Sequence, residues 1–230
     1  MSLSSPRSES PVRKYFRVRA STGDVIHYDK SQGKEVEQDI PFNFIVLDIL
    51  TTVGGFHEPS NSGIWANEVR SSTKDVLRVK NKSGLLVEGA YSEIKDRLKA
   101  VGGKFANSVY IAYRDGGELV LGNINFIGAS VSAWFDFSQG KRLDSAPGVA
   151  ITGFTEQKKG RTEYFVPTFE QWAVGENDLA TATALDRDLQ EYLASALNRI
   201  EDAVEGALRM TAPPVQESFS SQPLTATAPF

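Results

Sequence analysis

Basic and aromatic side chains occur together at three places in this sequence, and their types suit one kind of chemistry. Cations bind phosphate oxygens, and flat rings stack on bases, each stacked base being worth about 1–3 kcal/mol. A further aromatic residue, Phe56, follows a pair of glycines. The three clusters are Arg13, Tyr15, Arg17 and Arg19; Trp65 with Arg70, Arg78, Lys80 and Lys82; and Tyr110 with Arg114.

Each cluster also has a structural alternative. Trp65 adjoins Ile64 and is equally consistent with a core position, whereas Phe56 is either an exposed ring or a plug at the end of a barrel. For the arginines of residues 13–19, the alternative is a solvated edge strand without a binding role, because charges on an edge strand prevent aggregation. Alternation along a strand favours a binding role for Tyr110, because it places that ring on the face opposite to Val109.

Catalytic motifs are missing from the sequence. The two histidines, His27 and His57, lie far apart, and the absence of cysteine excludes disulfides and cysteine-ligated metal sites. No phosphate-binding loop, GxSxG or HExxH motif occurs. Glu35 and Glu37 fall in a polar segment, residues 30–39, that is typical of a solvated loop. We therefore expect no enzymatic activity, no cofactor and no metal site.

The net charge of −4 conceals an uneven distribution. From Glu170 onward, ten acidic residues against three arginines give −7, which leaves +3 for residues 1–169. Such asymmetry is a recognised indication of nucleic-acid binding combined with an acidic arm. The negative arm also suggests competition with nucleic acid for the basic face.

The expected elements fall in the order of three strands, one short helix and two strands. This is the order of an OB-fold, a five-stranded, partly open barrel that binds oligonucleotides. Hairpins are expected on either side of it, at residues 13–28 and 149–166. The five strands are expected at residues 40–53 (ending at Gly54-Gly55), 64–70, 76–80, 104–114 and 118–127, and the helix at 91–101.

Four regions are expected along the chain. Residues 1–11 are rich in Ser and Pro and are expected to be disordered, and residues 12–177 form the OB-fold domain with its hairpins. Residues 178–210 form an acidic amphipathic helix, whose apolar stripe either packs on the barrel or pairs with a second chain, so a monomer and a homodimer are both open. Residues 211–230 form a disordered tail.

The chain has no apolar signal sequence and no run of about 20 apolar residues, so we expect a cytoplasmic protein with no membrane partner. For a viral protein this is the cytoplasm of the host cell.

A resemblance adds to this interpretation. The runs Phe44–Asp48 and Thr52–Phe56, and above all Ser-Asn-Ser-Gly-Ile-Trp-Ala-Asn-Glu-Val-Arg at Ser60–Arg70, resemble phage-encoded single-stranded DNA-binding proteins with an OB-fold. The matching region covers about residues 40–137. The resemblance implies binding of single strands with little sequence specificity during phage DNA replication or recombination, without catalysis.

The C-terminus offers a second resemblance. Pro229-Phe230 is similar to the end of single-strand binders that recruit replication or recombination proteins through an acidic tip, although here the last twenty residues hold one acidic residue, Glu217. A structural or assembly protein of a virion, with a β-barrel and a self-associating helix, is the alternative function.

Overall fold

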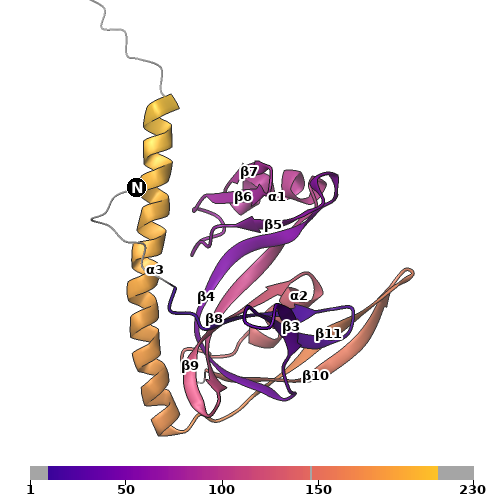
Figure 1. Cartoon of the computed structure of the whole chain (residues 1–230), viewed down its shortest axis with the longest axis vertical. Helices are drawn as coiled ribbons and strands as arrows, with labels where there is room; N and C mark the ends of the chain where they lie inside the picture. The colour runs from indigo at the N-terminus through magenta and orange to yellow at the C-terminus, as the bar shows by residue number, and fades with distance from the viewer. Residues whose placement is uncertain (1–9, 146, 212–230) are drawn as a thin grey trace, which may run out of the picture.

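The computed structural model describes residues 10–145 and 147–211, with side chains as far as Leu197. Most of the N-terminal segment 1–11 and almost all of the tail 211–230, including Pro229-Phe230, lie outside the described residues. The described chain is mainly β, as expected, with one large mixed sheet and a long C-terminal helix (Figure 1).

The centre of the sheet is formed by three long antiparallel strands, β4 (Phe42–His57), β8 (Gly103–Asp115) and β9 (Glu118–Ile127). β5 (Ser62–Ala66), β6 (Leu77–Asn81) and β7 (Gly84–Gly89) continue from β4. β1 (Lys14–Arg19) joins β9 in parallel, and β2 (Asp24–Asp29) and β3 (Lys34–Glu37) follow it. A short 3₁₀ helix (Glu58–Ser60) links β4 and β5.

The strand order partly matches the sequence-based expectation. The expected five strands lie in the order β6–β5–β4–β8–β9, and α1 (Tyr91–Ala100) precedes β8 as predicted. Among the described residues no pairing joins β9 to β6 or β7, because the edge of β9 that does not pair with β8 pairs with β1. The sheet is therefore open along this path.

Two details of the strands differ from the prediction. β4 does not end at Gly54-Gly55 but continues to His57, since these glycines allow β4 and β8 to approach closely. A Cβ atom on Gly55 would lie 2.3 Å from the carbonyl oxygen of Gly102. The supposed loop of residues 30–39 contains β3, a short strand whose carboxylates face the arginines of β1.

The main core fills the inner face of the sheet. Apolar side chains alternate along β1, β4, β8 and β9, so each strand turns one row inward. α2 (Ala129–Ser138), a segment whose structure the sequence left open, places Trp134 against Phe126 with ring centroids 5.1 Å apart. β10 (Gly148–Lys159) and β11 (Thr162–Gln171) confirm the expected second hairpin, and β10 also pairs with the beginning of β4.

The C-terminal helix α3 (Glu176–Thr211) runs along the other face of the sheet (Figure 1). Its apolar stripe packs there through Leu185, Leu189, Tyr192 and Leu193, against Leu50, Tyr110 and Leu121. The described part of the stripe therefore packs on its own sheet, as one of the two alternatives predicted. Within the described residues no helix is long and apolar enough to cross a membrane.

Candidate nucleic-acid interface

The strand register brings parts of all three clusters onto one face of the sheet. Tyr15 lies across from Asn123, and Asn123 lies across from Tyr110. On the other side of β4, Gly54 is paired with Trp65, and Trp65 with Lys80. Cross-strand partners point to the same side of a sheet, so one surface extends from Tyr15 on β1 to Lys80 on β6. α3 packs on this same surface.

A groove of about 540 Å³ lies between this surface and α3. Tyr15 and Trp65 contribute aromatic rings to its wall, and Asn67, Asn123 and Asn125 contribute amides. Tyr192, Leu193 and Leu197 form the wall on the helix side. Flat rings and amides around a groove suit an unpaired base, which offers a π face for stacking and a polar edge for hydrogen bonds.

The aromatic residues next to the groove are accessible. Trp65 is 50% exposed and Phe56 is 51% exposed, so neither belongs to the core. Because Phe56 pairs with Gly63, two residues from Trp65 on β5, the two rings share a face. Lys80, directly across from Trp65, is exposed. This corner of the sheet thus combines two rings with a cation.

Lys82 and Arg78 lie close to this corner, but both have partners. The ammonium of Lys82 donates to the carbonyl oxygen of Asn61 over 3.4 Å. Arg78 Nε donates to Glu88 Oε1 over 2.8 Å, across the β6–β7 hairpin. Lys82 keeps its exposure at the edge of the sheet, whereas the charge of Arg78 is balanced locally.

The expected exposure of Tyr110 is wrong. The residue does face away from Val109, but α3 covers it and leaves the side chain 3% exposed. Its hydroxyl donates to Glu68 Oε2 over 2.6 Å, and Ser108 donates to the other carboxylate oxygen. Burial, together with the Glu68 carboxylate, raises the pKa of Tyr110. Tyr110 therefore fixes Glu68 at the floor of the groove and offers no ring for stacking.

Arg114 and Arg70 both contact the acidic helix. Arg114 donates to both carboxylate oxygens of Asp178, over 2.6 and 2.8 Å. Arg70 binds Asp48 at 3.0 Å and Gln190 at 2.9 Å. The structure does not bring Arg114 to the groove; it lines a separate hollow near the start of α3.

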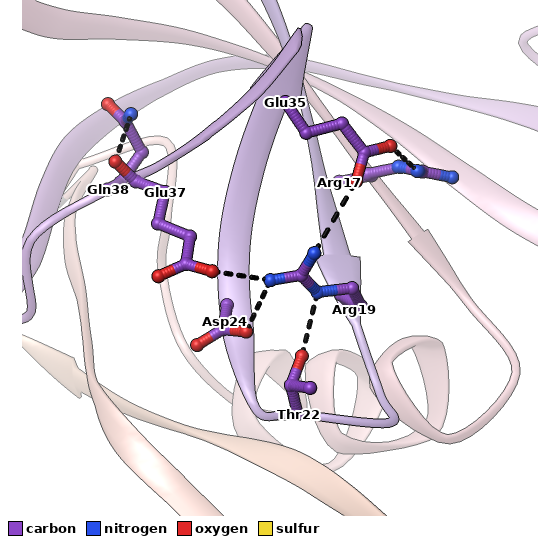
Figure 2. A network of polar contacts seen from close by, with 7 residues as sticks. All are labelled: Arg17, Arg19, Thr22, Asp24, Glu35, Glu37 and Gln38. Atoms are coloured by element: carbon purple, nitrogen blue, oxygen red, sulfur yellow. Dashed lines mark hydrogen bonds and ion pairs between the residues drawn. The ribbon is translucent and has the colours of Figure 1, made fainter.

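The N-terminal arginines are held by carboxylates as well. Arg13 lies 3.3 Å from Asp115 at the β8–β9 turn. Figure 2 shows Arg17 bound to Glu35, and Arg19 surrounded by Asp24, Glu35 and Glu37. The hydrogen bond to Asp24 is the main reason that the pKa of Arg19 is raised. Tyr15, in contrast, is 56% exposed and faces the groove.

Sequence reasoning missed the amides of the groove. Asn123 and Asn125 flank the buried Ile124 on β9, and this alternation alone places both on the face opposite to the core. Asn67 and Glu68 belong to the Ser60–Arg70 run but were not singled out. The signal that could have found them is this alternation, since the polar residues of a strand lie on the face opposite to its apolar residues.

Comparisons with protein-family models, with curated proteins and with solved structures found no match. Within the described part of the chain, no group of three or more His, Cys, Asp or Glu residues is arranged to hold a metal ion.

Proposed function

We propose that this protein binds single-stranded DNA with little sequence specificity. The observation that carries the proposal is the groove between Tyr15 and Trp65, two rings that are each about half exposed and that come from strands 50 residues apart. Amide side chains line the space between them, and Lys80 lies beside Trp65. These are the stacking and electrostatic elements by which proteins hold single strands.

The path of the strand follows from the charges. Glu68 places a carboxylate in the groove and repels phosphate, so the bases enter the groove while the backbone follows its rim. Lys80 and Lys82 supply cations at that rim, next to Trp65 and Phe56. Contacts with phosphates and ring faces are independent of sequence.

The arrangement of strands supports the same proposal. We interpret the order β6–β5–β4–β8–β9, with α1 before β8, as an OB-fold whose barrel is open between the third and fifth of its strands. The run that most resembles phage single-stranded DNA-binding proteins, Ser60–Arg70, contributes Trp65, Asn67 and Glu68 to the groove. We therefore propose membership of that class, with a role in phage DNA replication or recombination and no catalysis.

Titration with oligo-dT, followed by tryptophan fluorescence, tests the proposal. Trp134 is buried and Trp172 donates its Nε1–H to the carbonyl of Val149, so quenching on binding is expected from Trp65. The quenching should weaken as salt rises, with a slope of about −0.7 in log K against log salt for each phosphate contact. Absence of both salt-sensitive quenching and a mobility shift would overturn the proposal.

A further inference from the structure

A second hollow, of about 530 Å³, lies on the same face of the sheet over β1, β2 and β9. Its lining includes Tyr15, Asn123 and Asn125, which also line the groove beside α3. The two spaces are therefore neighbours that share one wall. Tyr28, on β2, lies on the far side of the second hollow.

The register between β1 and β2 sets two exposed rings side by side. Phe16 is paired with His27, so the next residues along, Tyr15 and Tyr28, come opposite one another. Tyr15 is 56% exposed and Tyr28 is 60% exposed. Side chains in opposed positions of adjacent strands lie about 5 Å apart at their Cβ atoms. The two phenol rings thus form a platform at the edge of the hollow.

Asn125 gives the hollow a hydrogen-bonding group. Its Oδ1 is buried, and no donor among the described residues reaches it. A buried acceptor without a partner costs free energy. Oδ1 is shielded from solvent, so a ligand with an N–H group recovers that free energy when the Asn125 amide turns toward the hollow that it lines. All four DNA bases carry such a donor on an amino or ring imino group.

The charge of the hollow argues against an isolated anion as its ligand. Arg17 lines it but is bound to Glu35, which reaches across from β3 (Figure 2). Their charges balance, so the hollow favours a neutral, flat molecule with an N–H group at its edge.

We infer that the hollow between Tyr15, Tyr28 and Asn125 is a second nucleobase subsite, so that a DNA strand passes from the groove over Tyr15 onto the N-terminal hairpin. The base stacks on the Tyr28–Tyr15 platform, and its N–H group donates to Asn125 Oδ1 once the side-chain amide has turned toward the hollow. This inference rests on the proposed function and adds Tyr28, a role for Asn125 and a direction of the strand to it.

The geometry also sets the length of DNA required. Tyr28 and Trp65 lie on strands separated by five steps across the sheet, β2–β1–β9–β8–β4–β5. At about 4.8 Å per step this is roughly 24 Å across the strands. The register adds an offset along the strands, because Tyr15 comes level with Asp48 on β4 and Trp65 with Gly54, about 20 Å further on. The two sites are therefore roughly 30 Å apart, which a strand with the B-form rise of 3.4 Å per nucleotide covers in about nine nucleotides, and an extended strand in fewer. A twelve-nucleotide strand therefore spans both sites, whereas a four-nucleotide strand bound at Trp65 does not.

The test compares the full-length Tyr28→Ala, Tyr28→Phe and Asn125→Ala variants, with dT12 and dT4 as ligands. Tyr164→Ala is the matched control, because Tyr164 lies on β11 and lines neither space. Trp65 is intact in all of them, so its quenching reports binding. Thermal unfolding of each variant checks the fold, and Tyr28 is exposed enough for its loss to leave the core unchanged.

We expect Tyr28→Ala to weaken dT12 binding by about 5-fold or more and to leave dT4 binding unchanged, since one stacked base is lost. Tyr28→Phe should bind as the wild type, and Asn125→Ala should weaken dT12 binding. Wild-type affinity of both Tyr28→Ala and Asn125→Ala for dT12 would overturn the inference, whereas failure of the wild type to bind dT12 would overturn the proposed function itself.

Discussion

Trp65 is the residue whose removal tests the proposed interface most directly. Its ring is 50% exposed, lies outside the clusters of buried apolar residues and faces the groove. Stacking on one base is worth about 1–3 kcal/mol, so Trp65→Ala should weaken binding of dT12 by about 5- to 150-fold. Since half of the side chain is already in solvent, the loss of stability should be about 1 kcal/mol or less, a change in Tm of under about 4 °C.

Binding is best measured here by fluorescence anisotropy of a labelled dT12, because the variant lacks the reporting tryptophan. Trp65→Phe keeps a ring and should retain most of the affinity while losing most of the quenching. Phe135→Ala removes another partly exposed ring, 44% exposed and outside the groove, and should bind as the wild type. Unchanged affinity of Trp65→Ala, or an unfolded variant, would refute the reasoning, the latter by showing that Trp65 supports the core.

Three further predictions concern charge, packing and pH. Lys80→Ala should reduce the slope of log K against log salt by about 0.7, because one phosphate contact is lost. Lys159→Ala, at the tip of the β10–β11 hairpin, should not change this slope. Equal slopes for the two variants would contradict a phosphate contact at Lys80. Leu189→Ala, at a fully buried position on the sheet-facing side of α3, should cost about 2–5 kcal/mol in urea unfolding. Leu179→Ala, where the side chain is 44% exposed, should cost about 1 kcal/mol or less, and similar losses for the two variants would mean that α3 does not dock on the sheet in solution. Burial, and then the charge of Lys14, lowers the pKa of His27 below its ordinary value of 6.5, so the unfolded chain takes up a proton at a higher pH than the folded one. The free energy of unfolding should therefore fall as the pH drops from about 7.5 to about 5.5, and it should fall less in His27→Gln. An equal decrease in the two proteins would contradict this origin.

Local patterns in the sequence were sufficient for most of the elements. The alternation in residues 13–19 and the β-branched run from residue 42 gave β1 and β4, and the three-and-four spacing gave α1 and α3. Gly54-Gly55 misled the prediction because a glycine pair marks both a strand end and a close approach of two backbones. β3 was missed because a four-residue polar strand at an edge has no apolar row to reveal it.

The candidate site also has a part that the sequence predicts and a part that depends on the tertiary structure. The sequence alone supplied Tyr15, Trp65 and Lys80 as candidates, because alternation tells which side of a strand a residue is on, but it left open whether Trp65 belongs to the core. It did not reveal which other strand lies across that side, and this depends on pairings between distant segments: β1 beside β9, and α3 over Tyr110. These contacts bury Tyr110 and join the groove to the hollow at Tyr28, while the pairing of β2 and β3 beside β1 brings the carboxylates that neutralise Arg17 and Arg19. Only the tertiary structure decided which of these segments meet. The free energy of each contact depends on two surfaces that are far apart in the sequence and come together only in the folded chain.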